Sequence, residues 1–140
     1  METKIIAVIL SCMDCRLHDP DAGIIMQLRD ILGADAVYLP SVAGPDGSII
    51  KGGPGKEKIV SDIQIAVDGG ASIVGTLSHY DCKGYPVSDE EHRIATVRAS
   101  KELGESLKRY DGQPVSLVAR PRKKDEDFQY TWVVEKISVH

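Results

Sequence analysis

Two short motifs in this sequence contain residue types that bind metal ions. Residues 12–16 read CMDCR and residues 79–82 read HYDC, so Cys12, His79 and Cys82 together offer two thiolates and one imidazole. Zinc prefers such ligands in a tetrahedral arrangement, and three protein ligands leave its fourth position open to water. The spacing of His79 and Cys82 also favours metal binding over an isolated histidine. The sequence therefore predicts a catalytic Zn²⁺ site.

Both motifs directly follow apolar segments that are typical of buried strands. Residues 4–11 form a continuous aliphatic and β-branched run, and residues 71–77 form another that leads into His79. In open parallel sheets, ligands bind beyond the carboxyl ends of the strands. If these two strands are neighbours, the motifs meet at one edge of the sheet although more than sixty residues separate them.

The other segments alternate between helical and strand patterns. Three helices are predicted from apolar periodicity and caps, at residues 21–32 with Gly33 as C-cap, at residues 57–67, and at residues 89–110 with Ser88 as N-cap. Further strands are predicted at residues 35–39, 115–119 and 130–137. Residues 40–55 contain five glycines and three prolines and are predicted to form a long loop, and the charged residues 120–127 a solvated loop or hairpin tip.

This alternation predicts an α/β fold in a single domain that spans residues 1–140. We expect a mainly parallel sheet with right-handed crossovers, flanked by helices. The first and third strands become neighbours when the second strand lies outside the first. The expected strand order is therefore 2-1-3-4, with a further edge strand formed by the last segment.

Composition and charge exclude several classes of partner. The 140 residues, 42% hydrophobic and 27% charged, suffice for one compact core. A net charge of -4 and a pI near 5.5 leave no basic surface for nucleic acid or an anionic membrane. The apolar run at residues 5–10 is too short for a bilayer span and lacks a cleavage-site pattern. We therefore expect a cytoplasmic protein with a small-molecule partner. Three cysteines, an odd number, favour reduced thiols that do chemistry or bind metal over a disulfide framework.

The two motifs resemble those of the β-class carbonic anhydrases. The resemblance rests on Cys12-x-Asp14-x-Arg16 after the first strand and on His79-x-x-Cys82 after the third, and it covers about residues 4–85. It implies a β-carbonic-anhydrase-like fold, a homodimer or higher homo-oligomer, and reversible hydration of carbon dioxide to bicarbonate. It also implies that Cys12, His79 and Cys82 hold the zinc ion.

Asp14 and Arg16 are the catalytic residues that the resemblance implies. Asp14 would accept a hydrogen bond from zinc-bound hydroxide and orient it toward carbon dioxide, while Arg16 keeps Asp14 ionised. In some members of the family the aspartate binds the zinc instead and closes the site. The sequence leaves both roles open for Asp14.

The sequence departs from the family pattern at three places. Residues 41–44 read SVAG where the family usually has RNAG, and Lys83 stands where glycine is common. The glycine-rich residues 45–55 lengthen the separation of the two motifs. We expect Lys83 to face solvent, and residues 45–55 to form either a lid or an irregular excursion.

Cys15 raises two alternatives to a catalytic zinc site. Added to the three ligands named above, Cys15 makes a Cys₃His set, whose four protein ligands would form a closed structural site in a catalytically silent protein. Cys12-x-x-Cys15 is also the spacing of thioredoxin-like redox motifs, but this reading leaves the His79 motif without a role. We favour the open site, because the Asp14 and Arg16 pair would serve no purpose in a closed one.

Overall fold

The strands form one sheet, and the predicted strand order is confirmed. The computed structural model describes residues 4–126 and 129–137. Within these residues the main strands run in the order β2-β1-β4-β5-β6, and all neighbours are parallel except β5 and β6. These strands are β1 (Ile6–Cys12), β2 (Ala36–Tyr38), β4 (Ile73–His79), β5 (Val115–Pro121) and β6 (Trp132–Lys136). A short strand that the sequence analysis does not predict, β3 (Ser41–Val42), pairs with the end of β1.

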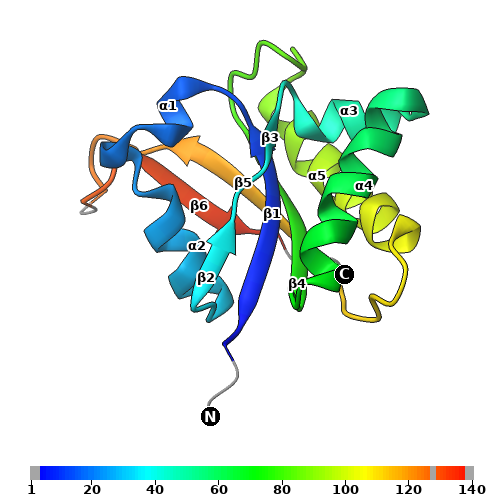
Figure 1. The fold of residues 1–140 in the computed structure, drawn as a ribbon. Helices are drawn as coiled ribbons and strands as arrows, with labels where there is room; N and C mark the ends of the chain where they lie inside the picture. The colour runs from blue at the N-terminus through cyan, green and yellow to red at the C-terminus, as the bar shows by residue number, and fades with distance from the viewer. Residues whose placement is uncertain (1–3, 127–128, 138–140) are drawn as a thin grey trace.

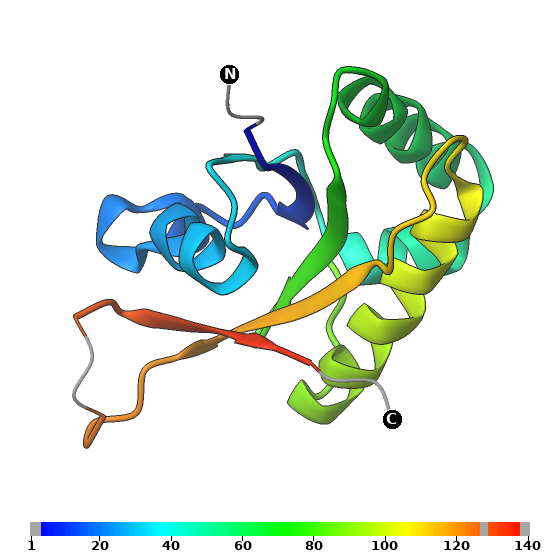
Figure 2. The same ribbon diagram turned by 90° about the horizontal axis from the view of Figure 1, so that it is seen from below.

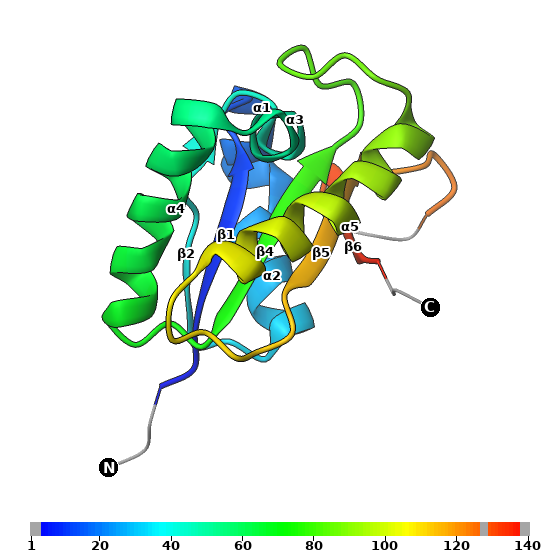
Figure 3. The ribbon, with the colours of Figure 1, turned by 90° about the vertical axis from the view of Figure 1, so that its right-hand side faces the viewer.

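Helices cover both faces of the sheet, so the predicted α/β class is confirmed (Figure 1 and Figure 3). One face carries α1 (Cys15–His18), a 3₁₀ turn (Pro20–Ala22) and α2 (Ile24–Leu32). The other face carries α3 (Pro45–Lys51), α4 (Gly53–Asp68) and α5 (Asp89–Ser106). Figure 2 shows the sheet between these two layers. None of the helices in the described residues has the length and hydropathy needed to cross a bilayer.

The central strand β1 is buried on both sides because its side chains alternate between two apolar cores. Ala7 and Ile9 belong to the core that contains α2, whereas Val8 and Leu10 belong to the core under α3, α4 and α5. Successive side chains of a strand point to opposite faces of the sheet, so a continuous aliphatic run fills both cores. Burial of each large aliphatic side chain contributes about 1.5–3 kcal/mol. This explains why the run at residues 4–11 predicts a central strand correctly.

Two helices are shorter than predicted. The helix expected from residue 21 begins at Ile24, because Pro20–Ala22 form a tighter 3₁₀ turn. The helix expected to end at residue 110 ends at Ser106, where the next residue is already extended. The predicted caps are confirmed, since Gly33 is the left-handed C-cap of α2 and Ser88 accepts a hydrogen bond from the first turn of α5.

The charged segment at residues 120–127 is only partly the solvated loop that the sequence predicts. Arg120 lies within β5 and pairs with Glu126 at 2.6 Å and with Glu135 of β6 at 2.8 Å. The Arg120 side chain is largely buried by these contacts. Asp127, the last residue of the predicted loop, lies outside the described residues.

The prediction of a long loop at residues 40–55 is wrong, because α3 and the start of α4 occupy most of it. Pro45 and Pro54 lie in the first turns of these helices, where the missing backbone N–H has no intrahelical acceptor to lose. Gly44 and Gly52 lie just outside α3, with positive φ values that glycine adopts without strain. The glycines and prolines therefore punctuate two helices, and the segment is neither a lid nor an irregular excursion.

A buried polar pair joins α3 to α5. Nδ1 of His92 donates a hydrogen bond of 2.8 Å to Oδ2 of Asp46, and both side chains are fully buried. Oδ1 of Asp46 accepts a further hydrogen bond from the backbone of Gly47. No motif points to His92 in the sequence, because its burial depends on the unpredicted helix α3. The pair therefore holds α3 against α5.

Replacement of Asp46 by alanine should destabilise the fold. Asp46→Ala leaves the imidazole of His92 buried without its acceptor, and we expect the free energy of unfolding to fall by about 2–4 kcal/mol. Urea denaturation followed by circular dichroism measures this change. Asp62→Ala is the matched control, since Asp62 is an exposed carboxylate on α4 that pairs with Lys58. Equal stability of the two variants would contradict the role given to Asp46.

Candidate metal centre

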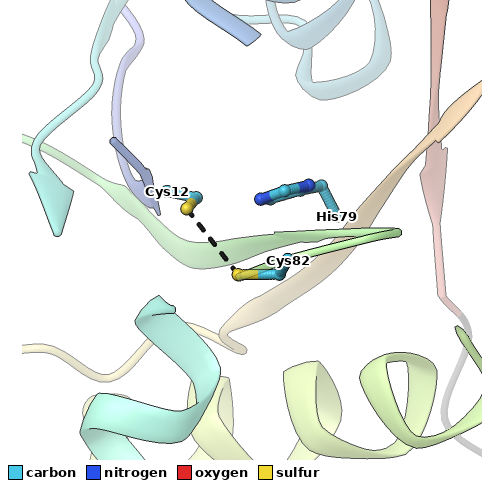
Figure 4. Close-up of side chains that lie close together, drawn as sticks. All are labelled: Cys12, His79 and Cys82. Carbon is cyan, nitrogen blue, oxygen red and sulfur yellow. Dashed lines mark hydrogen bonds between the residues drawn. The ribbon is translucent and has the colours of Figure 1, made fainter. Parts of the chain in front are cut away.

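Three potential metal ligands converge at the carboxyl edge of the sheet. Cys12 is the last residue of β1, His79 is the last residue of β4, and Cys82 follows in the loop after β4. Because β1 and β4 are parallel neighbours, their ends lie side by side. The ligand atoms of the three residues all lie within 4.8 Å of one another, and Figure 4 shows them pointing toward a common centre. The two sulfur atoms are 3.8 Å apart.

The orientation of His79 leaves one ring nitrogen available to a metal. Nδ1 of His79 donates a hydrogen bond of 2.7 Å to the carbonyl oxygen of Tyr80. This bond places the proton on Nδ1 and the lone pair on Nε2. Nε2 is buried and has no hydrogen-bond partner among the described residues. A buried nitrogen without a partner is costly unless a ligand satisfies it, so this atom fits a metal ion.

The environment of the two thiols separates their pKa values. Burial raises the pKa of Cys12, but the adjacent imidazole of His79 and the backbone amides of Gly44 and Asp14 outweigh burial and lower it to about 7. Burial and the neighbouring Cys12 sulfur raise the pKa of Cys82 to about 11. Without a metal, Cys12 is therefore the thiol that ionises near neutral pH. A bound cation would draw the proton from both.

The backbone of the segment before α3 lies in close contact with the loop that carries Cys82. Gly44, the residue before α3, lies against Gly84 in the loop that carries Cys82. A Cβ atom on Gly44 would come within 2.7 Å of the backbone carbon of Gly84, so no side chain fits there. Gly44 is one of the two residues that the sequence keeps from the family pattern at positions 41–44. Its role here is close approach of the two loops.

Asp14 and Arg16 form a bidentate ion pair beside the three ligands. Nη2 of Arg16 lies 2.7 Å from Oδ2 of Asp14, and Nε of Arg16 lies 3.0 Å from Oδ1. The backbone N–H of Arg16 also donates to Asp14, which caps α1. These hydrogen bonds lower the pKa of Asp14 to about 2, so the carboxylate stays ionised at neutral pH. Oδ2 of Asp14 is 3.9 Å from Nε2 of His79 and therefore faces the candidate site.

Arg16 also ties the two motifs together. It donates to the side chain of Asp81 at 3.1 Å and to the backbone oxygen of Asp81 at 3.0 Å. Asp81 lies between two predicted ligands and has a positive φ of 56°, which is uncommon for aspartate. The contact with Arg16 stabilises this backbone conformation of the ligand loop.

Cys15 is not part of the convergent group in the described residues. It begins α1 and its side chain is exposed, whereas Cys12 and Cys82 are buried. The structure thus does not bring together the four residues of the Cys₃His alternative. Lys83 is exposed, as the sequence analysis expects.

The sequence analysis misses two residues that contact the site. His18 donates a hydrogen bond of 2.9 Å from Nε2 to the carbonyl oxygen of Cys12. Trp132 of β6 contacts both His79 and Arg16 through its ring. The proximity of His18 to the first motif is a weak signal in the sequence, but Trp132 lies far from both motifs and no spacing pattern points to it.

Comparison with known proteins identifies the family. Residues 1–112 match the model of a family described as "Putative carbonic anhydrase". The chain belongs to this carbonic anhydrase family. No curated protein and no solved structure matches the chain. The resemblance to carbonic anhydrases stated from the two motifs is therefore confirmed.

The match to the carbonic anhydrase family covers both motifs and all helices up to α5. It ends before β5 and β6, so Trp132 lies outside the matched residues. A Cys₂His group that can hold a metal ion is present, and its two thiolates and imidazole suit zinc. The assignment of Cys12, His79 and Cys82 as zinc ligands stays a prediction.

Replacement of Cys82 should remove the metal, whereas replacement of Cys15 should not. Cys82→Ser takes away one of three convergent ligands, and we expect the protein to be purified with less than about one tenth of a zinc ion per chain. Cys15→Ser is the matched control and should keep the wild-type zinc content. Plasma emission spectrometry measures zinc per chain. Loss of zinc from the Cys15 variant would support the closed Cys₃His site instead.

Zinc affinity should rise with pH. Each thiol must lose its proton to become a ligand, and Cys82, with a pKa of about 11, carries its proton throughout the neutral range. Its release makes the affinity rise about tenfold per pH unit, and the rise becomes steeper at lower pH, where Cys12 and His79 are also protonated, since the Cys12 thiolate raises the pKa of His79 against the effect of burial. Competition with a chromophoric chelator between about pH 6 and 9 measures this dependence. An affinity independent of pH would contradict thiolate ligation.

Proposed function

We propose that the chain is a zinc-dependent carbonic anhydrase, which converts carbon dioxide and water to bicarbonate and a proton, and catalyses the reverse reaction. The family match supports the class of enzyme. The observation that carries the proposal is the convergence of Cys12, His79 and Cys82 within 4.8 Å, with the Asp14 carboxylate 3.9 Å from His79. A bound zinc ion would supply a Lewis acid that lowers the pKa of water from 15.7 to about 7.

The three ligands and their surroundings have separate tasks in this proposal. Cys12 and Cys82 supply negative charge from within the apolar core, and His79 supplies a neutral nitrogen whose proton is held on Nδ1. Three protein ligands leave one coordination position free for a small molecule. Cys15 is exposed and is not among the convergent ligands of the described residues, which supports an open site over a closed one.

Asp14 is proposed to orient the attacking water. Its pKa of about 2 keeps the carboxylate in the acceptor form, so Oδ2 can accept a hydrogen bond and direct a lone pair of the water oxygen toward the carbon of the substrate. Nε and Nη2 of Arg16 both donate hydrogen bonds to Asp14, and this pairing keeps the carboxylate from binding the metal directly. The arrangement therefore supports Asp14 as an orienting group and not as a fourth ligand.

A homodimer in the cytoplasm is a further part of the proposal. Tyr38 on β2 and Ile65 on α4 are large apolar side chains that are mostly exposed, and such surface favours association. Sedimentation equilibrium measures the oligomeric state, and a monomer at micromolar concentration would contradict the homodimer.

The thiols of Cys12 and Cys82 must remain reduced to bind metal, which supports a reducing compartment. Fluorescence microscopy of the tagged protein tests the location.

Stopped-flow measurement of carbon dioxide hydration tests the function. For zinc-loaded protein we expect a rate above the buffer background that rises between about pH 6.5 and 9. Asp14→Asn should keep the zinc and lower the rate about 10–100-fold, because the neutral amide is a weaker hydrogen-bond acceptor than the carboxylate. Asp62→Asn, an exposed substitution on α4, is the control and should match the wild type. Zinc-loaded protein without activity at any of these pH values would refute the proposal.

A further inference from the structure

The ring of Trp132 lies against two residues of the candidate site. Its centre is 5.8 Å from that of the His79 imidazole, and the planes meet edge to face at 83°. The guanidinium carbon of Arg16 lies 5.6 Å from the ring centre. Trp132 is the only tryptophan of the chain and is 7% exposed.

A buried glutamine fixes the backbone that carries this ring. Nε2 of Gln27, on α2, donates to the carbonyl oxygen of Trp132 at 2.8 Å, and Oε1 accepts from the backbone N–H of Val134 at 2.8 Å. Nε2 also donates to the carbonyl oxygen of Ala22. Gln27 is itself buried, and its hydrogen bonds to the backbone of β6, the edge strand of the sheet, leave this strand little freedom to shift. Figure 2 shows β6 at the edge of the sheet beside α2.

We propose that Trp132 is a positioning residue of the metal centre, which holds the imidazole of His79 and the guanidinium of Arg16 in the orientations that the site requires. The inference rests on the proposed function. Hydrogen bonds to Asp14 and Asp81 hold the guanidinium of Arg16 along its edge, and because the side chain is 41% exposed, movement out of the guanidinium plane is opposed mainly by what packs on its faces. The indole ring covers one side and stops this movement.

The same ring restricts rotation of His79. Among the described residues the imidazole makes one hydrogen bond, from Nδ1 to Tyr80, and this bond alone does not fix the tilt of the ring. The indole lies against the imidazole, so the two contacts together fix the direction of Nε2. Loss of the indole would free the imidazole of His79 and the guanidinium of Arg16 to move, and Asp14, which Arg16 holds, lies only 3.9 Å from Nε2. Both changes alter how a metal is held.

Metal binding to tryptophan variants tests this inference without relying on turnover. In Trp132→Leu we expect the zinc dissociation constant to rise about tenfold, as is typical when a partner of a metal ligand is removed. Trp132→Phe keeps an aromatic face and should stay within about threefold of the wild type. Val133→Leu, on the opposite face of β6, is the matched control and should not change the affinity. Chelator competition measures all four proteins.

The visible absorption spectrum of the cobalt-substituted protein gives a second readout, because it reports the ligands and their geometry. We expect a shifted spectrum for Trp132→Leu and wild-type spectra for Trp132→Phe and Val133→Leu. Unchanged zinc affinity and an unchanged cobalt spectrum in a folded Trp132→Leu protein would overturn the inference. So would equal losses in the leucine and phenylalanine variants, because they would indicate a packing effect alone.

Fluorescence of the wild-type protein keeps the inference testable if Trp132→Leu does not fold. Zinc titration should change the emission of the only tryptophan at a stoichiometry of one ion, since His79 lies against the ring. Constant emission during stoichiometric zinc binding would overturn the inference. A wild-type protein that binds zinc but does not hydrate carbon dioxide would refute the proposed function, whereas the affinities and cobalt spectra would still decide the role of Trp132.

Discussion

The parallel pairing of β1 with β4 is the interaction on which the site depends. The two strands run side by side from Ala7 and Ile73 to Leu10 and Thr76, so their carboxyl ends reach the same edge of the sheet. Alternating aliphatic side chains anchor β1 in both cores and exclude a slip by one residue, which would exchange the faces of every side chain. The strand pairing thereby makes neighbours of residues that are far apart in the sequence, and the contact of Arg16 with Asp81 joins the two motifs directly.

Burial and charge are balanced around this edge. Two thiolates and a charged imidazole would be costly to bury in an apolar core without partners. The protein lowers this cost differently for each thiol. Cys12 receives backbone amides and an imidazole, while Cys82 keeps a raised pKa. Farther out, the Asp14 and Arg16 pair lies where partial exposure lowers the desolvation penalty. The site therefore offers negative charge, from the Cys12 thiolate and the nearby Asp14 carboxylate, that a bound cation would neutralise.

The sequence predicts the strand order and the ligand group because local signals coincide there. Each motif follows an apolar run, so the positions of Cys12 and His79 follow from strand geometry alone. The segment around Pro45 fails because its glycines and prolines are equally compatible with a loop and with two closely spaced helices. The burial of His92 follows from that helix and is hidden for the same reason. Trp132 reaches the site through the antiparallel pairing of β6 and a hydrogen bond to Gln27, and neither leaves a spacing pattern.

The contact of Gly44 with Gly84 makes α3 part of the ligand geometry. Gly44 is both the residue before α3 and a neighbour of the Cys12 sulfur, while Gly84 belongs to the loop of Cys82. The buried pair of Asp46 and His92 fixes α3 to α5, and so it also holds Gly44, the residue that contacts both ligand segments. A helix that contributes no ligand is therefore attached to the surroundings of both sulfurs, and transplantation of the two motifs onto another sheet would have to include this helix.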